Sequence, residues 1–265
     1  MPSPPLIAYD HVGKSFGADG AARVVAVDDV SLEVAEGEFL AIVGGSGSGK
    51  TTLLRLANRL IDADHGTVTI EGEDVRAADP VALRRRIGYV FQSGGLFPHL
   101  SVAQNIGITP KLLGTPPAEI SARVDELLAL VQLERDRHRD RLPQELSGGQ
   151  RQRVGVARAL AAKPRIVLMD EPFGALDPLT RDALGEDYRA LHRTLALTTV
   201  MITHDMTEAL LLADRIAVMR AGRLLASGTP AELSQSRDGY VIELLRTPRR
   251  QAERLNALLP RGAGA

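Results

Sequence analysis

Short uninterrupted apolar runs alternate along the chain with stretches in which apolar residues recur at helical spacing. The apolar runs predict buried strands of a parallel sheet, and they lie at residues 39–43, 87–91, 166–169 and 198–203. Helical spacing follows the first run, with a helix end expected near Arg59. Apolar residues also recur at helical spacing over residues 102–133, and interruptions of the helical segment are predicted at Pro110 and at 115–117. These elements predict an α/β protein built on an open parallel sheet.

Turn-bounded segments with β-type alternation predict further strands. The segments lie at residues 6–10, 24–34, 67–70, 215–219 and 223–226. A turn is expected at residues 17–20, between the first two of these strands, and another at Ala221-Gly222, which makes the last two a hairpin.

Two charged segments are expected to be solvated surface. Residues 84–86 are three arginines on a predicted helix face, and residues 134–141 carry alternating charges. His138 in the second segment has no ligand-like neighbours along the chain, so we assign no metal site there. The end of the chain, residues 246–265, is expected to be a frayed helix and disorder.

The composition narrows the class of protein. The 265 residues include 32 lysines and arginines against 33 acidic residues, so no overall basicity indicates a nucleic-acid partner. The absence of cysteine excludes disulfides and thiolate metal sites. No apolar run approaches the length of a membrane span, and we expect the chain to be soluble by itself. The length fits one large domain, or one domain with an inserted lobe.

A glycine-rich stretch between the first predicted buried strand and the first helix carries the strongest chemical signal. It consists of Gly44, Gly45, Ser46, Gly47, Ser48, Gly49, Lys50, Thr51 and Thr52. This is the pattern G-x-x-x-x-G-K-[ST], in which glycines let backbone N–H groups approach phosphate oxygens and the helix adds its positive N-terminal end. Lys50 is expected to reach the outer phosphates, and the Thr51 hydroxyl to bind Mg²⁺.

Two other predicted strands end in polar residues, Asp170-Glu171 and His204. Because the carboxyl ends of parallel strands share one edge of a sheet, these residues and the glycine loop are expected to form one site. Adjacent residues on a strand point to opposite sides. One carboxylate can therefore hold the metal ion while the other orients a water.

Single residues elsewhere are less informative. Gln92 follows a predicted strand and says little alone. Phe16 is either a core or turn aromatic or a stacking surface for a purine base, and its spacing leaves both readings open.

Ser147, Gly148 and Gly149 are a candidate second glycine-based anion site. An N-cap serine, bare backbone amides and a helix start can hold a phosphate. Two phosphate-binding helix starts in one chain either serve different ligands or close over the same nucleotide. The third interpretation is that Ser147 only caps the helix and binds no phosphate.

With these motifs the chain resembles the nucleotide-binding subunits of ATP-binding cassette (ABC) transporters over residues 6–235. The resemblance identifies Phe16 as the adenine-stacking aromatic, residues 44–52 as the Walker A loop, Gln92 as the Q-loop, residues 146–150 as the signature motif, residues 166–171 as the Walker B strand, Asp177 as the D-loop aspartate and His204 as the switch histidine. It implies a P-loop NTPase fold of the ABC type, with a RecA-like core, an antiparallel β subdomain and an inserted α-helical subdomain. The cassette would span residues 6–240 with the helical subdomain at about 93–163, and residues 241–265 would be a C-terminal tail.

The same resemblance implies an ATPase with ATP and Mg²⁺ as cofactors. Thr51, Gln92 and Asp170 would serve Mg²⁺, Glu171 would polarise the attacking water, and His204 would contact the γ-phosphate. Two copies, or two paired ABC subunits, would associate head to tail. The signature residues Ser147 to Gln150 of one copy would then cover the γ-phosphate held by the other.

The resemblance also implies partners and a location. The chain would lie on the cytoplasmic face of the cell membrane, bound to integral membrane permease subunits that work with a substrate-binding protein or domain. The surface at residues 94–100 would pass movement to the permease, and no nucleic-acid partner is expected. One departure from the family pattern is Gly45, where importers commonly carry proline; it makes the loop more flexible.

A finer resemblance is to the ATPases of osmoprotectant uptake systems, for glycine betaine, choline and related quaternary amines. It rests on residues 58–61, 94–99, 109–114 and 203–209. The chain has no tryptophan and few tyrosines, so an aromatic cage for a quaternary amine is expected in the partners. It ends about thirty residues past the core, too short for the C-terminal nucleotide-sensing domains of many relatives, so we expect no regulation of that kind.

Lipid or amino-acid transport is the alternative cargo. A non-transport cassette protein of DNA repair or translation is disfavoured because neither a coiled-coil insertion nor a second cassette is present.

Overall fold

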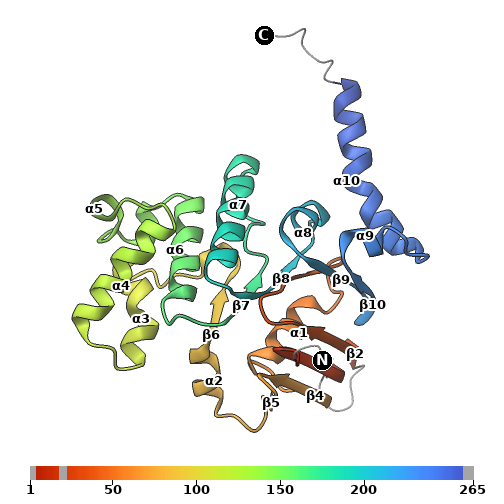
Figure 1. The fold of residues 1–265 in the computed structure, drawn as a ribbon, viewed down its shortest axis with the longest axis horizontal. Helices are drawn as coiled ribbons and strands as arrows, with labels where there is room; N and C mark the ends of the chain where they lie inside the picture. Colours follow the sequence, from red (N-terminus) through yellow and green to blue (C-terminus); the bar gives the residue numbers. More distant parts are fainter. Residues whose placement is uncertain (1–3, 18–22, 259–265) are drawn as a thin grey trace.

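The computed structural model describes residues 4–17 and 23–258 (Figure 1). The strands in chain order are β1 (Ile7–Phe16), β2 (Val24–Val34), β3 (Phe39–Val43), β4 (His65–Ile70), β5 (Glu73–Asp74), β6 (Ile87–Val90), β7 (Ile166–Asp170), β8 (Thr198–Thr203), β9 (Arg215–Arg220) and β10 (Arg223–Gly228). The helices are α1 (Lys50–Ala57), α2 (Pro80–Arg86), α3 (Val102–Leu112), α4 (Pro117–Leu130), α5 (Arg135–His138), α6 (Gly148–Leu160), α7 (Pro178–Thr194), α8 (Met206–Leu212), α9 (Pro230–Leu233) and α10 (Gly239–Leu258). Short 3-10 helices lie at Gln92–Gly94 and Pro143–Glu145.

A mixed sheet with the strand order β10-β9-β3-β8-β7-β6 forms the centre of the described chain. The strands β9, β3, β8, β7 and β6 run parallel, and β10 joins β9 antiparallel at the edge. All four buried strands and the hairpin expected from the sequence are therefore present. In the register of this sheet Val43 pairs with Thr203, and Asp170 pairs with Ile202. The loops that follow β3, β7 and β8 consequently leave the sheet at one edge.

The central strand β3 shows why its sequence is an unbroken apolar run. Phe39, Ala41 and Val43 belong to one apolar cluster, and Leu40 and Ile42 belong to a second. Successive side chains of a strand point to opposite faces, so each face of the sheet has its own core. The first cluster includes side chains of α3, α4, α6, α7 and α8, and the second includes those of α1, β1, β2 and β4. Each fully buried leucine or isoleucine contributes about 1.5–3 kcal/mol to folding.

A separate antiparallel sheet has the order β2-β1-β4-β5. The strand β1 pairs with both neighbours, and Ile7 lies opposite Val34 on one side and Ile70 on the other. The strands expected at residues 6–10, 24–34 and 67–70 are found here, and β1 continues to Phe16, which pairs with Val24. The turn expected at residues 17–20 lies largely outside the described residues. This sheet packs over α1 through the second apolar cluster.

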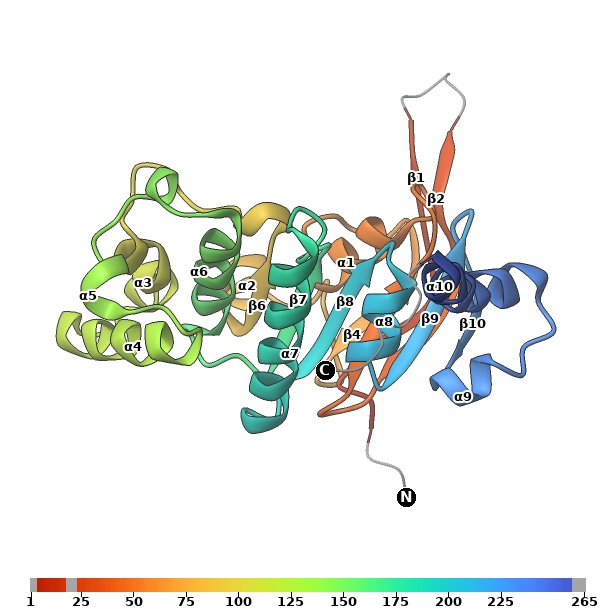
Figure 2. The same cartoon turned by 90° about the horizontal axis from the view of Figure 1, so that it is seen from above.

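The helices α3, α4, α5 and α6 gather on one side of the central sheet, beyond β6 (Figures 1 and 2). The expected apolar face of α4 is buried at Val124, Leu127 and Leu128. The break expected at residues 115–117 is present, but the interruption expected at Pro110 is wrong, because α3 continues to Leu112. Pro110 lies two residues from the end of that helix. Because proline has no N–H, one hydrogen bond of α3 is lost there, but only two residues of the helix follow it.

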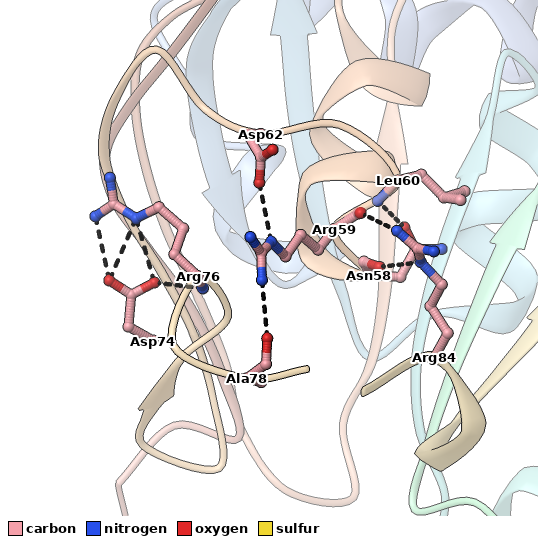
Figure 3. Close-up of polar contacts among 8 residues, drawn as sticks. All are labelled: Asn58, Arg59, Leu60, Asp62, Asp74, Arg76, Ala78 and Arg84. Carbon is pink, nitrogen blue, oxygen red and sulfur yellow. Dashed lines mark hydrogen bonds and ion pairs between the residues drawn. The ribbon is translucent and has the colours of Figure 1, made fainter. Parts of the chain in front are cut away.

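The C-terminal end of α1 is held by a polar network (Figure 3). The Asn58 side chain accepts a hydrogen bond from the Leu60 amide at 3.2 Å, and Arg84 donates to the carbonyls of Asn58 and Arg59. Arg59 has a φ of 51° and donates through its guanidinium to the carbonyl of Ala78 at 2.8 Å. These contacts satisfy carbonyls left without partners at a helix end. Residues 58–61, one of the stretches of the osmoprotectant resemblance, therefore terminate the helix that begins at the glycine loop.

The last described element, α10, extends away from the body of the molecule (Figure 1). Asp238 caps its first turn by accepting hydrogen bonds from the amides of Tyr240 and Val241, and Val241 is fully buried. Residues 251–258 of the helix are exposed. The helix expected in the tail is present as far as Leu258, and residues 259–265 lie outside the description. Among the described residues, no helix combines the length and apolar character needed to span a membrane.

Candidate functional site

The glycine loop lies between β3 and α1, as the sequence predicts. Gly47 and Gly49 have φ angles of 74° and 99°, in the left-handed region that favours glycine. A Cβ at Gly49 would lie 2.1 Å from the carbonyl oxygen of Ala26, so glycine also allows β2 to approach the loop. The loop ends at Lys50, where α1 begins with its unpaired backbone N–H groups. This arrangement can bind an anionic group.

Lys50 is buried, and its ammonium lies inside the curve of the loop. The Nζ atom donates to the carbonyls of Gly44 at 2.8 Å and Gly45 at 3.0 Å. Burial lowers the pKa of Lys50, and the negative charges of Glu171 and Asp170 oppose that shift. The cation is therefore held between the loop and two carboxylates at the ends of neighbouring strands.

Thr51 and Asp170 form a group of oxygen donors next to Lys50. The Thr51 hydroxyl donates to Asp170 Oδ1 at 3.4 Å. The Tyr89 hydroxyl donates to Asp170 Oδ2 at 3.3 Å, and the Arg55 guanidinium lies 3.9 Å from the same atom. Burial raises the pKa of Asp170, and Arg55 opposes the shift. A hydroxyl and a carboxylate side by side are a donor set that suits Mg²⁺.

A second group of polar side chains surrounds Glu171. Its Oε2 lies 3.4 Å from His204 Nδ1 and accepts a hydrogen bond from Gln92 Nε2 at 3.4 Å. Glu171 has a φ of 44°, an uncommon conformation for glutamate that costs on the order of 1–3 kcal/mol and is typical of functional sites. Asp170 and Glu171 contact different groups, so the two carboxylates are placed for different tasks.

Tyr89 and Arg55 are site neighbours that the sequence reasoning missed. Tyr89 lies on β6, directly beside β7, and Arg55 lies one helical turn beyond Thr51 on α1. The four-residue spacing between Thr51 and Arg55 could have predicted this position, because residues four apart share one face of a helix. The position of Tyr89 became visible only with the pairing of β6 and β7.

Phe16 lies at the end of β1 with 45% of its surface exposed. Its partner in the sheet is Val24, two residues before Ala26, the point at which β2 meets Gly49. Two strand residues correspond to roughly 7 Å. The Lys14 ammonium lies 5.6 Å from the centre of the Phe16 ring. An exposed ring on a strand pair that meets the glycine loop through Ala26 suits stacking on a base better than burial in the core.

Replacing Phe16 by alanine is expected to weaken ATP binding about tenfold, because base stacking on an aromatic contributes roughly 1–3 kcal/mol. Binding of inorganic triphosphate is expected to be unchanged, since it has no base. Titration calorimetry with both ligands measures the two effects. Val24→Ala is the matched control, because Val24 is the exposed sheet partner of Phe16. Equal losses for ATP and triphosphate in Phe16→Ala would remove the stacking role.

The signature residues form a separate group at the start of α6. The Ser147 hydroxyl accepts a hydrogen bond from the Gln150 amide, and the Gln150 side chain accepts one from the Ser147 amide at 2.9 Å. A Cβ at Gly149 would lie 2.5 Å from the Thr180 methyl group, so glycine is needed where α6 meets α7. Asp177 caps α7 by accepting a hydrogen bond from the Thr180 amide at 3.0 Å, and hydrogen bonding from Thr180 lowers the pKa of Asp177. The residues Ser147, Gly148, Gly149 and Gln150 therefore lie near Asp177 of the same chain, the aspartate expected to form the D-loop.

His138 corrects an expectation about the charged segment at 134–141. It is buried, at 4% exposure, although the segment was expected to be solvated. Its Nδ1 lies 2.8 Å from the carbonyl of Glu134, and its Nε2 lies 3.2 Å from Gln150 Nε2. The imidazole is satisfied on both sides and supports the signature glutamine.

The loop after Gln92 is fixed by an arginine from α6. Arg158 is buried and donates to the carbonyls of Gly94 at 2.9 Å and Gly95 at 2.8 Å. Its guanidinium lies 5.6 Å from the ring of Phe91 and 5.9 Å from that of Phe97. Phe91 and Phe97 are nevertheless 44% and 43% exposed. The loop thus presents apolar surface from a rigid base.

The structure divides the expected site residues into two groups. Gln92, Lys50, Thr51, Asp170, Glu171 and His204 meet at the carboxyl edge of the central sheet. Ser147 to Gln150 lie with Asp177 at the junction of α6 and α7. In the described part of the chain, no hydrogen bond or ion pair joins the signature residues to the first group.

The sequence matches the family described as ABC transporter over residues 27–174, more than half of the chain. The chain therefore belongs to the ABC transporter family. Its fold is that of the ABC ATP-binding cassettes, which confirms the fold expected from the sequence. It is similar, with 32% identity and a TM-score of 0.75, to the ATP-binding cassette MJ0796, solved as a dimer in a post-hydrolysis state with ADP and Pi. That match covers 84% of this chain and 98% of MJ0796.

Among proteins of known function, the chain is 51% identical to the glycine betaine/carnitine/choline transport ATP-binding protein OpuCA of Bacillus subtilis, over 82% of this chain and 57% of OpuCA. It is 50% identical to the choline transport ATP-binding protein OpuBA of the same organism, over 91% of this chain and 62% of OpuBA. The chain thus spans about three fifths of the length of these two relatives.

Proposed function

We propose that the chain is an ATP-hydrolysing subunit of a membrane importer for osmoprotectants such as glycine betaine, choline or related quaternary amines. The observation that carries the ATPase proposal is the convergence of Lys50, the Thr51–Asp170 pair and the Glu171–His204 pair at one sheet edge. An ammonium, a metal-binding pair and a candidate base are the groups that phosphoryl transfer to water requires.

Each group has a task in this mechanism. Amides of the glycine loop and the Lys50 ammonium hold the phosphates of ATP. Thr51, Gln92 and Asp170 hold Mg²⁺, which when bound offsets phosphate charge. Glu171 polarises the attacking water, and His204 holds Glu171 in place and contacts the γ-phosphate. Little covalent help is needed, since positioning and charge supply most of the acceleration.

The signature residues act on a second copy of the chain in this proposal. Ser147 and the amides of Gly148 and Gly149 have the geometry of an anion site. Among the described residues, no hydrogen bond connects them to Lys50. Head-to-tail pairing would place them over the γ-phosphate of the partner. The dimeric state of the similar cassette MJ0796 supports this arrangement.

The domain division and partners follow from the same proposal. Residues 6–240 form the cassette, with a helical subdomain at about 93–163, and residues 241–265 form a tail. The exposed rings of Phe91 and Phe97 suit an apolar surface on a membrane permease subunit. The chain would then be held on the cytoplasmic face of the membrane through the permease, which in turn receives cargo from a substrate-binding protein or domain.

The cargo rests on the names of the relatives. OpuCA and OpuBA are named for betaine, carnitine and choline, and each shares half of its aligned residues with this chain. Quaternary amines are bound by aromatic cages, and this chain has no tryptophan, so its partners would select the cargo. Lipid or amino-acid transport remains the competing cargo.

The test is to purify the chain with its membrane partners in lipid vesicles and to measure ATP hydrolysis. Glycine betaine or choline is expected to stimulate hydrolysis several-fold, whereas an added phospholipid or amino acid is not. The same complex with Lys50→Ala is the control and is expected to lose hydrolysis in every condition. Stimulation by phospholipid or an amino acid alone would reassign the cargo, and full activity of the Lys50→Ala complex would overturn the ATPase site.

A further inference from the structure

The start of α10 reaches the glycine loop. The backbone N–H of Gly45 donates a hydrogen bond to the Tyr240 hydroxyl at 3.1 Å, across 195 residues of sequence. Gly45 is exposed, and its carbonyl accepts hydrogen bonds from Lys50 Nζ and from the Ser48 amide, so the contact with Tyr240 fixes the other side of the same residue. This contact joins the phosphate-binding candidate to an element that the site described above does not include.

Three features of the start of α10 hold Tyr240 in place. Its own amide donates to the Asp238 carboxylate at 2.8 Å, which begins the helix. The next residue, Val241, is fully buried in the main core. The Arg220 guanidinium lies 4.9 Å from the centre of the ring, within range of a cation–π interaction. The hydroxyl is therefore presented from a rigid support.

The end of β9 borders the other side of the loop. A Cβ at Gly44 would lie 2.2 Å from the carbonyl oxygen of Met219, so the backbone of β9 touches the loop directly before Gly45. Arg220, the next residue of β9, holds the Tyr240 ring. Gly44 thus contacts the end of β9, and Gly45 contacts the hydroxyl of Tyr240.

We propose that Tyr240 is a positioning residue for nucleotide binding, and that its hydroxyl holds the Gly45 amide so that the loop is already ordered when phosphates arrive. This inference rests on the proposed ATP-binding role of the loop. Ordering a flexible loop on binding costs free energy, and a fixed hydrogen bond reduces that cost in advance. The loop holds phosphates both before and during hydrolysis. The effect therefore falls on the affinity for ATP more than on kcat.

The experiment uses Tyr240→Phe, which removes the hydroxyl and keeps the ring over Arg220. The KM for ATP and the Kd for ADP are expected to rise about fivefold, the factor that corresponds to one ordinary hydrogen bond. The change in kcat is expected to be much smaller. Steady-state ATPase measurements and ADP titration provide these values, and thermal unfolding verifies that the variant is folded.

Combining Tyr240→Phe with each of two substitutions at Gly45 distinguishes loss of the Tyr240–Gly45 hydrogen bond from a general structural effect. In Gly45→Pro the loop has no N–H to donate, so adding Tyr240→Phe is expected to change KM no further. In Gly45→Ala the N–H remains, and a Cβ there lies 3.7 Å from the hydroxyl, an ordinary contact, so the fivefold effect is expected to persist. An equal effect of Tyr240→Phe in both backgrounds, or a KM like that of the parent, would overturn the inference.

Lys50→Ala distinguishes failure of this inference from failure of the proposed function. If Lys50→Ala abolishes ADP binding while Tyr240→Phe binds like the parent, the ATP site stands and Tyr240 has no part in it. If Lys50→Ala binds ADP like the parent, the site assignment itself is wrong, and the positioning role of Tyr240 is wrong with it.

Discussion

Glu171→Gln is expected to lower the kcat for ATP hydrolysis by about 100-fold or more, while ATP binding persists. Glutamine matches glutamate in shape, so it can keep the contacts with His204 and Gln92, both 3.4 Å from Glu171 in the structure. It cannot take up a proton from the attacking water. Binding then proceeds but the chemical step does not, so an ATP-bound dimer is expected to accumulate.

Hydrolysis assays and light scattering after gel filtration with ATP measure these two effects. Glu186→Gln is a matched control, because Glu186 is an exposed glutamate on α7 whose replacement makes the same change in charge. A Glu171→Gln protein that stays monomeric with saturating ATP would contradict closure of two copies around the nucleotide. A kcat close to that of the parent would remove Glu171 as the candidate base.

The second large effect is expected from a mixture of two inactive variants, Ser147→Arg and Lys50→Ala. Each alone has two defective sites per dimer, either at the signature serine or at the phosphate-binding lysine. In a mixed dimer, the intact loop of one subunit faces the intact serine of the other, so one complete site forms. With random pairing of equal amounts, about a quarter of the parental activity should return in the symmetric dimer assumed here.

The measurement is ATPase activity against the mixing ratio, with circular dichroism to verify that Ser147→Arg folds without its N-cap. Loss of that cap costs about 0.5–2 kcal/mol. A mixture of each variant with itself, prepared identically, is the control for exchange of subunits. Activity of the mixture no higher than that of either variant alone would contradict sharing of sites between subunits.

Local patterns were sufficient to predict much of the architecture. The apolar runs at β3, β6, β7 and β8 predicted a buried parallel sheet because both faces of such strands are covered. Polar residues directly after them then had to meet at one edge. The same reasoning explains why Asp170 and Glu171 were expected together, and why the glycine loop was placed correctly between β3 and α1.

Contacts between distant segments could not be predicted in this way. Tyr89 reaches Asp170 only through strand pairing, and Tyr240 reaches Gly45 from the far end of the chain. His138 looked solvated because its neighbours are charged, yet helix packing buries it against Gln150. Pro110 was expected to break α3, but its position near the helix end made it harmless. In each case, tertiary contacts outweighed the local sequence.

The hydrogen bonds from Arg158 to the loop after Gln92 have a mechanical consequence. The helix α6 has 13 residues, a length of about 20 Å at the usual rise per residue. Ser147 lies at one end of this helix, and near the other end Arg158 donates to the carbonyls of Gly94 and Gly95 and lies 5.9 Å from the centre of the Phe97 ring. Pressure on that ring would tilt the helix as a whole and swing the serine at its far end. In the proposed complex, a push from the permease on this surface and the closing of Ser147 over the partner's nucleotide would then be one displacement, transmitted without any change in secondary structure.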